Sequence, residues 1–179
     1  MLTDLLVREK ARILKRWSDL ILETYPPETS KFLKSSADRF RNPVGAAITE
    51  GTEVLFDALV RGVDHRSNEV SAALDNIVRI RAVQEFSPSV AIGFIFLLKK
   101  VVREHLVRDI QEKRLVDALL DFESKIDDMA LTAFNIYTGC RERIFEIRAV
   151  EIRNRTSRIL ERACEKFGMP SEWQPPVGK

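Results

Sequence analysis

Hydrophobic residues recur along most of the chain at spacings of three and four, which is the period of an amphipathic helix. Alternation of apolar and polar residues is weak, and the sequence contains no Asn-Gly or Asp-Gly pair of the kind that forms tight hairpins. The pattern therefore predicts an all-α fold. The helices are expected at residues 2–24, 28–37, 43–61, 68–83, 88–106 and 112–166.

Local signals mark the ends of the third of these helices. Asn42 precedes Pro43, a pairing typical of a helix N-cap followed by the first helical residue, and Gly62 follows the last apolar position. Gly51 lies on the predicted buried face of the same helix, where it costs about 1 kcal/mol of helix propensity. We expect another helix, or as the weaker alternative a ligand, to approach closely there.

The segment "SPSVAIGFIFLLKKVV", residues 87–102, is the most apolar part of the chain. A helix that spans a membrane needs roughly 20 apolar residues, and Lys99 and Lys100 end this run at about half that length. Ser87 and Pro88 suit a helix start. The segment is therefore predicted to be a core helix that neighbours contact on several sides, and no membrane insertion is expected.

The last predicted helix is far longer than a domain of this size requires. Between residues 112 and 166 it has no proline and a single glycine, Gly139. Its apolar residues follow the four-and-three spacing of a coiled coil, with one extra step of four after Cys140. We expect the helix to project from the globule or to pair in a dimer. The stripe expected at the dimer interface comprises Met129, Ala133, Ile136, Cys140, Ile144 and Ile147.

The end of the chain differs in composition from the rest. A helical domain is expected over residues 1–147, and residues 148–179 are expected to form the polar end of the long helix plus an irregular tail that contains three prolines. Trp173 is the large apolar group of that tail. We expect it to dock onto the domain, its dimer mate or a partner, and a disordered tip without a role is an equal alternative.

Charge and cysteine content indicate which binding partners and which cell compartment the sequence favours. The chain has 29 basic and 27 acidic residues, so its net charge is too small to attract nucleic acid electrostatically. The arginines between residues 141 and 162 alternate with glutamates and are interpreted as a solvated coiled-coil surface. Charges in the first ten residues exclude a signal peptide and favour a cytoplasmic protein. Cys140 and Cys164 are too far apart along one helix to form a disulfide.

No residue pattern indicates catalysis, a metal or a cofactor. His65 and His105 have no metal-ligand neighbours at ligand spacing. The acidic residues near the start of the last helix resemble carboxylate-bridged metal sites in spacing but lack the Glu-x-x-His partner, so they are interpreted as a solvated acidic first turn. Phosphate-loop, nucleophile-elbow and zinc-protease motifs are absent from the sequence. These acidic residues are Asp117, Asp121, Glu123, Asp127 and Asp128.

Several ordered segments carry a family resemblance that covers about residues 15–150. They are Tyr25-Pro26-Pro27, Phe32-Leu33, Asn42-Pro43-Val44-Gly45, Glu50-Gly51, Leu55-Phe56, Arg81-Ala82-Val83-Gln84 and Phe86-Ser87-Pro88-Ser89. In these segments the chain resembles the N-terminal domain of RsbT co-antagonist proteins of the RsbRD type, bacterial regulators associated with stress-signalling stressosome complexes. The resemblance implies a globin-like domain without haem that dimerises and passes a signal through its last helix.

The resemblance also implies a difference in organisation. In the co-antagonist proteins a STAS domain follows, which carries the phosphorylated residues, whereas this chain ends at Lys179 without one. We therefore expect a stand-alone, non-enzymatic sensor or adaptor that acts as a cytoplasmic homodimer and has a protein partner in a signalling pathway.

The alternative is a sensor that binds haem or a small apolar ligand. A globin haem needs an axial histidine on the helix at about residues 68–83, which has none, and His65 falls just before its start. Four aromatic residues could line a cavity for an apolar ligand, although filling of the core is the preferred interpretation. They are Phe56, Phe94, Phe96 and Phe134.

Overall fold

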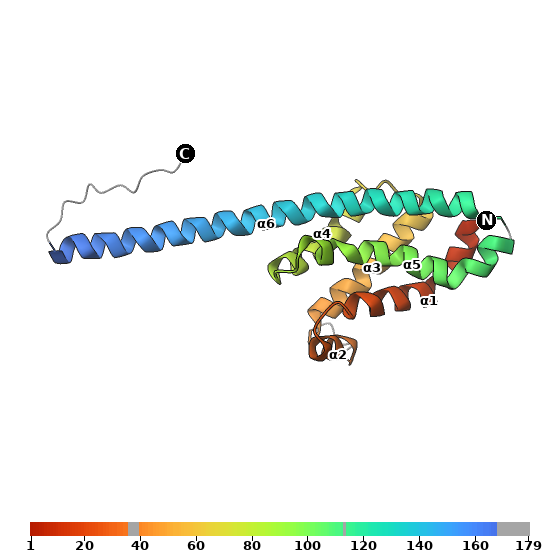
Figure 1. Ribbon diagram of the computed structural model, residues 1–179, viewed down its shortest axis with the longest axis horizontal. Coiled ribbons are helices and arrows are strands. Elements are labelled where there is room, and N and C mark those ends of the chain that lie inside the picture. Colours follow the sequence, from red (N-terminus) through yellow and green to blue (C-terminus); the bar gives the residue numbers. More distant parts are fainter. Residues whose placement is uncertain (36–39, 113, 168–179) are drawn as a thin grey trace. The chain divides into compact units, whose positions relative to one another are not determined.

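Six helices make up most of the computed structural model, which describes residues 1–35, 40–112 and 114–167 (Figure 1). They are α1 (Leu2–Leu22), α2 (Pro27–Ser35), α3 (Pro43–Arg61), α4 (Asn68–Val83), α5 (Pro88–Glu112) and α6 (Val116–Phe167). The described residues contain no strand. The all-α prediction is therefore confirmed, and none of the helices in these ranges is both long enough and apolar enough to cross a lipid bilayer.

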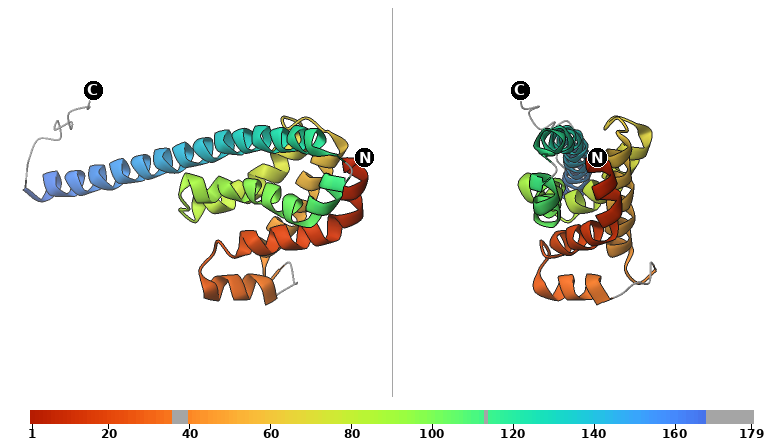
Figure 2. Two further views of the ribbon diagram at one scale, coloured as in Figure 1. Left: turned by 45° about the vertical axis from the view of Figure 1, so that its right-hand side comes forward. Right: turned by 90° about the vertical axis from the view of Figure 1, so that its right-hand side faces the viewer.

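The chain divides into two units, Met1–Cys140 and the residues from Arg141 onward. In the first unit α1 packs against α3 and α5, α3 packs against α4, and the short α2 lies against α1 and α3 (Figure 2). The centre of this unit is filled by large side chains that have no exposed surface or almost none. They include Trp17, Phe56, Leu74, Phe94 and Ile95.

Helix α5 is the core helix that the apolar segment predicts. Its buried residues lie on several sides and include Ala91, Phe94, Ile95, Leu98 and Val101. The end of the helix was misplaced, because α5 continues past the expected end at residue 106 to Glu112. The physical reason is that Leu106 and Ile110 are both buried, so the apolar face of α5 extends one turn further than expected.

Helix α3 has the ends that the sequence predicts. The Asn42 side chain accepts a hydrogen bond of 2.9 Å from the Gly45 amide, and Gly62 has the left-handed φ of 70°. The close approach at Gly51 is made by α4, since a Cβ atom on Gly51 would lie 2.7 Å from the Ile77 Cδ1 atom. Of the two alternatives for Gly51, the structure shows the neighbouring helix.

Three helices of the first unit end in the same hydrogen-bond pattern. In α3, α4 and α5 the amide two residues past the helix cap bonds to a carbonyl in the last turn, as in the Schellman motif. The bonds are Val63 to Ala58 at 2.9 Å, Phe86 to Arg81 at 3.2 Å and Leu115 to Ile110 at 3.0 Å. The residue with positive φ is a glycine only in α3; it is Glu85, with φ of 61°, after α4 and Arg114, with φ of 51°, after α5.

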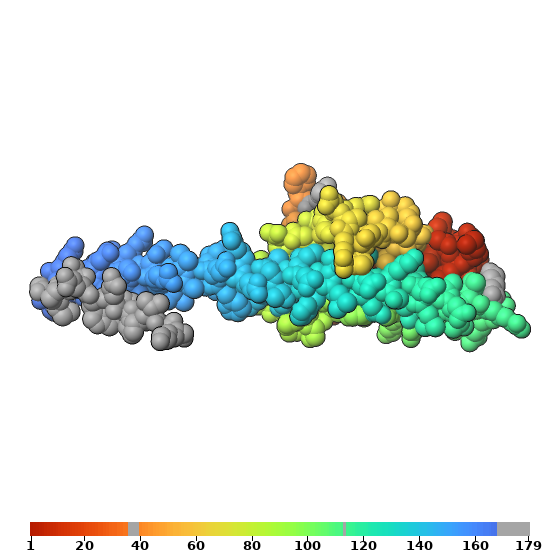
Figure 3. All heavy atoms as spheres, turned by 90° about the horizontal axis from the view of Figure 1, so that it is seen from above, coloured from red at the N-terminus to blue at the C-terminus, as the bar shows by residue number. Residues whose placement is uncertain are grey.

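The first part of α6 packs on α5 through apolar and ionic contacts. Phe122, Ile126 and Met129 are buried. Arg103 of α5 donates two hydrogen bonds to the Glu123 carboxylate, at 2.6 and 2.5 Å, and Lys99 forms an ion pair of 2.6 Å with Asp127. In the view of Figure 3 this part of α6 lies between α3 and α4 on one side and α5 on the other.

The interpretation of these carboxylates as a solvated first turn is therefore wrong for Glu123. Its side chain is 6% exposed and is held by the Arg103 guanidinium. The reason is geometric: Glu123 lies next to Phe122 and one turn before Ile126, so it faces the α5 side of the helix. Asp117, Asp121 and Asp128 are exposed, as expected.

Candidate functional site

The most unusual side chain in the first unit is Arg81, near the end of α4. It has no exposed surface, although arginine is rarely buried completely. Its Nη2 atom donates to the Thr24 hydroxyl at 2.9 Å and to the Val90 carbonyl at 3.0 Å. Its Nε and Nη1 atoms have no hydrogen-bond partner among the described residues. Arg81 is thus a buried cation whose donors are only partly satisfied.

Three aromatic rings surround this guanidinium. Its Cζ atom lies 5.3 Å from the ring centre of Tyr25, 4.6 Å from that of Phe86 and 5.8 Å from that of Phe94. The rings come from the α1–α2 turn, the α4–α5 turn and α5, and the Tyr25 and Phe86 rings also meet edge to face at 5.1 Å. We call Arg81 with these three rings the Arg81 cage. Cation–π attraction of this kind strengthens when water is excluded.

The electrostatics of the cage follow from its burial. Removal from water lowers the pKa of Arg81 and raises the pKa of Tyr25, a rise that the nearby guanidinium opposes. An arginine nevertheless stays protonated in proteins. The Tyr25 hydroxyl lies close enough to the guanidinium to interact with it, and this interaction opposes part of both pKa shifts. The cage therefore holds one positive charge next to a neutral phenol.

The cage is connected directly to α1 and α6. The Tyr137 hydroxyl of α6 donates to the Phe86 carbonyl at 2.7 Å, which ties α6 to the α4–α5 turn. The Trp17 indole of α1 donates to the Phe94 carbonyl at 2.7 Å and stacks on the Phe94 ring at a centroid distance of 6.5 Å. Phe86 thus contacts the Arg81 guanidinium through its ring and accepts the hydrogen bond from α6 through its carbonyl.

Sequence reasoning missed this cluster even though its parts were visible. Tyr25, Arg81 and Phe86 each belong to a different segment that carries the family resemblance, and 56 residues separate the first from the second. Only the packing of the α1–α2 turn against the end of α4 brings them together. The signal that could have pointed to them was the presence of one aromatic or basic residue in each of these ordered segments.

The four aromatic residues considered as cavity lining lie in two environments. Phe56 and Phe94 are buried in the core of the first unit. Phe96 on α5 and Phe134 on α6 are 46% and 49% exposed. The structure places the second pair at the surface, away from the filled centre of the unit.

The residues of the expected dimer stripe also differ in exposure. Met129 and Ala133 are buried in the core of the first unit, and Ile136 and Cys140 pack partly against it. In the second unit Ile144 is half-buried and Ile147 is 59% exposed. Trp173, for which docking was expected, lies outside the described residues.

The second unit carries an apolar stripe that sequence reasoning did not single out. Phe145, Ile152 and Ile159 are seven residues apart and are 57%, 65% and 60% exposed. We call these three residues the C-terminal stripe. The smaller residues Ala149, Thr156 and Ala163 complete its four-and-three spacing. Arginines occur one residue before each of these, at Arg148, Arg155 and Arg162.

The histidines and cysteines form no recognisable reactive site. His105 Nδ1 lies 2.9 Å from the Val101 carbonyl of its own helix, and His65 lies beside Asp64 in the α3–α4 turn. Within the described ranges, no three or more His, Cys, Asp or Glu side chains cluster closely enough to hold a metal ion. Cys140 and Cys164 do not form a disulfide with each other, and burial raises the pKa of Cys140.

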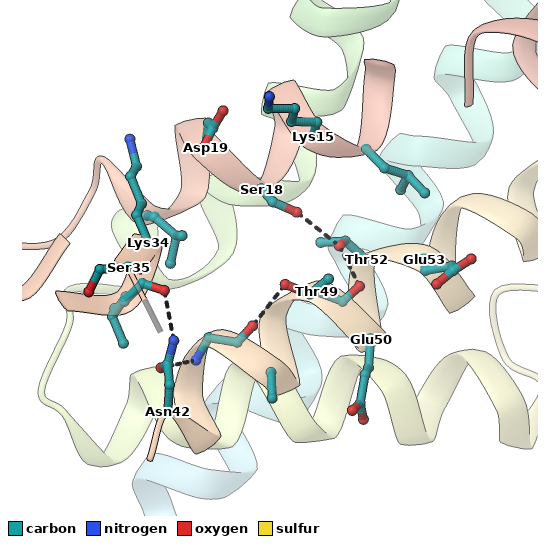
Figure 4. A pocket seen from close by; sticks show the side chains of 15 residues that line it. Lys15, Ser18, Asp19, Lys34, Ser35, Asn42, Thr49, Glu50, Thr52 and Glu53 are labelled. Atoms are coloured by element: carbon teal, nitrogen blue, oxygen red, sulfur yellow. Dashed lines mark hydrogen bonds between the residues drawn. The ribbon is translucent and has the colours of Figure 1, made fainter. Parts of the chain in front are cut away.

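A cleft of about 590 Å³ lies between α1, α2 and α3 (Figure 4). Several of its uncharged polar groups form hydrogen bonds within the three helices. Asn42 donates to the Leu33 carbonyl at 2.7 Å, Thr52 donates to the Thr49 carbonyl at 3.0 Å, and the Ser18 and Thr52 hydroxyls lie 3.4 Å apart. Because these groups already have partners, they brace the three helices, and the Arg81 cage is the stronger candidate for a functional site.

Comparison with known proteins gives one family and one distant relative. The model of a family described as the RsbT co-antagonist protein rsbRD N-terminal domain matches residues 11–152, a range that contains the whole Arg81 cage and Tyr137. An uncharacterised protein of Archaeoglobus fulgidus is 25% identical over 148 residues, which cover 80% of this chain and 84% of that protein. No solved structure matches the chain significantly.

Proposed function

The chain belongs to the family of the RsbT co-antagonist protein rsbRD N-terminal domain, and on that premise we propose that it is a non-enzymatic cytoplasmic signalling module. It acts as a homodimer, relays a signal through α6 and regulates a protein partner. The functional domain covers residues 1–147, and residues 148–179 comprise the polar end of the long helix and a tail. Its fold is of the globin-like, haem-free type that the family resemblance implies.

The observation that carries the relay is the hydrogen bond from Tyr137 to the Phe86 carbonyl. Phe86 is the residue at which the chain leaves the α4 helix cap, and its ring also contacts the Arg81 guanidinium. A change in the cage that moves Phe86 would act on α6 through this hydrogen bond. This contact therefore supports a route from the interior of the first unit to the helix that leaves it.

The C-terminal stripe supports the dimer. Residues spaced by seven present one continuous face to a second helix, and burial of exposed Phe145, Ile152 and Ile159 by a second copy would remove apolar surface from water. Residues flanking such a seam set the orientation of the helices. In an antiparallel pair centred on Arg155, this residue would face its own copy and Arg148 would face Arg162 of the second copy, which like-charge repulsion disfavours.

A parallel pair suits the charges better. Parallel pairing places Arg141 next to Glu146 of the second copy and Arg155 next to Leu160 of the second copy, while Arg148 meets Arg153. One attractive contact then offsets one repulsive contact, whereas the antiparallel arrangement has only repulsive ones at these positions. The proposed dimer is therefore parallel, an arrangement that would place the two emerging helices side by side.

Light scattering of the purified chain across a dilution series tests the proposal. The expected mass at micromolar concentration is twice the 20.5 kDa of the chain. A mass of one chain throughout the series would contradict the homodimer. The relay is tested separately by Tyr137→Phe, which should alter amide exchange in both the α4–α5 turn and the middle of α6.

A further inference from the structure

We propose that the second unit binds an acidic amphipathic helix of a partner protein along the C-terminal stripe. The three residues of the stripe are each more than half exposed, so they offer apolar surface to a partner. Arg148, Arg155 and Arg162 follow one edge of the stripe at the same spacing of seven, and all three are exposed. We call these three residues the arginine ridge.

The two edges of the stripe carry different charges. The opposite edge is formed by the residues that directly follow the stripe residues, Glu146, Arg153 and Leu160, and these are one acid, one base and one apolar residue. Arg155 of the ridge forms an ion pair of 3.3 Å with Glu151 of its own helix. Both side chains of this pair are well exposed, so it is readily exchanged for a pair with a partner. The uniform positive charge is therefore confined to one edge.

This one-sided charge distinguishes a helix from other acidic partners. Contacts to the phosphates of a nucleic acid would use the arginine ridge but would leave the apolar stripe in water. A helix that lies flat on an anionic membrane brings both edges of its apolar stripe to the headgroups, and one edge here carries Glu146. A partner helix covers the stripe with its own apolar residues and places an acidic edge against the ridge.

A second copy of the chain complements the ridge poorly. In a parallel pair the ridge faces the opposite edge of the second copy, so that Arg148 meets Arg153 and Arg155 meets Leu160. Neither arginine gains an opposite charge from these contacts. A helix with glutamate or aspartate at the facing positions would instead form ion pairs with every residue of the ridge.

The packing between the stripe residues gives a second reason. Ala149, Thr156 and Ala163 occupy the intervening positions of the interface. Equivalent positions meet in a parallel pair, so each of these small residues would face its own copy and bury little apolar surface. Leucine or isoleucine on a partner helix would bury more surface there. The partner helix would thus replace the second copy in the proposed dimer, although the inference does not rest on that dimer, because a single chain presents the same stripe and ridge.

Two synthetic peptides test the inference. Both are helical heptad repeats as long as the stripe, with leucine at the interface positions. One has glutamate and the other has lysine at both edges, and these like charges keep each peptide from pairing with itself. Each labelled peptide is titrated with the purified chain at one ionic strength, and fluorescence anisotropy gives its Kd.

The expected result is a preference for the glutamate peptide. An exposed ion pair changes affinity by a factor of about two, and a like-charge pair has a similar cost. Over the three positions of the ridge, the glutamate peptide should bind roughly 50-fold more tightly than the lysine peptide. Dimerisation of the chain raises the apparent Kd of both peptides equally and leaves their ratio unchanged. Failure of the homodimer and failure of this inference are therefore distinguishable.

Charge reversal locates the preference on the ridge. Arg148→Glu with Arg155→Glu should make the lysine peptide the tighter binder. The matched control is Arg143→Glu with Arg158→Glu, which adds the same charge on the side of α6 away from the stripe and should keep the glutamate peptide ahead. All four positions are exposed, and circular dichroism confirms that each variant keeps its helix content.

Three results would overturn the inference. The first is the absence of binding by either peptide, and the second is equal affinity for the two. The third is displacement of the glutamate peptide by duplex DNA or by vesicles of anionic lipid whose own binding survives Ile152→Glu with Ile159→Glu. That result would assign the ridge to a polyanion, because a partner helix requires the apolar stripe as well.

Discussion

The Tyr137 hydroxyl donates a hydrogen bond of 2.7 Å to the main-chain carbonyl of Phe86, 51 residues earlier in the chain. Tyr137→Phe removes the donor, keeps the ring and leaves that carbonyl without this partner. We expect the free energy of unfolding to fall by about 1–2 kcal/mol. Urea unfolding followed by circular dichroism measures this loss.

The matched control for Tyr137→Phe is Thr138→Val. The Thr138 hydroxyl bonds only to the Phe134 carbonyl of its own helix, at 3.0 Å. Its replacement should change stability by less than about 0.5 kcal/mol. Equal losses in the two variants would show that the Tyr137 bond does not hold α6 to the α4–α5 turn.

The end of α5 gives a stabilising prediction. Arg114 has φ of 51° in the left-handed region, where a glycine has no steric cost. Arg114→Gly should therefore raise the free energy of unfolding by about 1 kcal/mol. Gly62→Ala, at the equivalent position after α3 with φ of 70°, should lower it by a similar amount. Chemical unfolding of both variants measures the two changes, and a loss of stability in Arg114→Gly would contradict the expectation.

These two helix ends also show why the sequence predicted one boundary and misplaced the other. Gly62 stands where α3 ends, and glycine is the residue that such an end favours. The same hydrogen-bond pattern closes α5, but an arginine occupies the left-handed position. The conformation there is stabilised by packing of the surrounding chain, which a local pattern does not report.

The candidate site illustrates a second limit of the sequence. Arginine is usually exposed, so nothing in the composition around Arg81 indicates that it is buried. The regular spacing of apolar residues along α6 was visible in the sequence. Spacing alone does not show which of these residues are buried in the core of the same chain. Met129 and Ala133 are buried within the first unit, whereas Ile147 is exposed. The presence of helices was predictable from local residues. Which face of each helix contacts another helix depends on tertiary packing, so it was not predictable in the same way.

Gly45 is expected to be essential for the cap of α3. A Cβ atom at this position would collide with the Asn42 side chain and lie 2.7 Å from its Oδ1 atom, the atom that caps the helix. Gly45→Ala should displace the cap and lower the free energy of unfolding by roughly 1–2 kcal/mol. Gly93→Ala is the control, because nothing lies within 4 Å of a Cβ atom there. It should be neutral or slightly stabilising in the same unfolding experiment.

The Cys140 thiol should titrate above its ordinary range in the folded protein. Burial raises its pKa, and the nearby Arg79 partly opposes the shift. Because the folded-state pKa is the higher one, the contribution of this thiol to stability is complete below the unfolded pKa and is lost as pH rises toward the folded pKa. In a Cys164→Ser background, the alkylation rate against pH should have its midpoint higher in native protein than in urea. Coincident midpoints would contradict this.

The C-terminal stripe predicts which substitutions separate the proposed dimer. In the double variant Ile152→Glu with Ile159→Glu, both new residues are good helix formers at positions that are exposed in the single chain. In the dimer the same two substitutions place four carboxylates at the interface between the two helices. We expect the dimer dissociation constant to rise roughly 100-fold or more, with the helix content little changed. Sedimentation across a dilution series measures it. Ile144→Glu with Ile147→Glu is the matched control, since it adds the same charge on another side of α6. If this pair dissociates the dimer and the first pair does not, the interface follows the stripe from Met129 to Ile147, and the C-terminal stripe is not the seam.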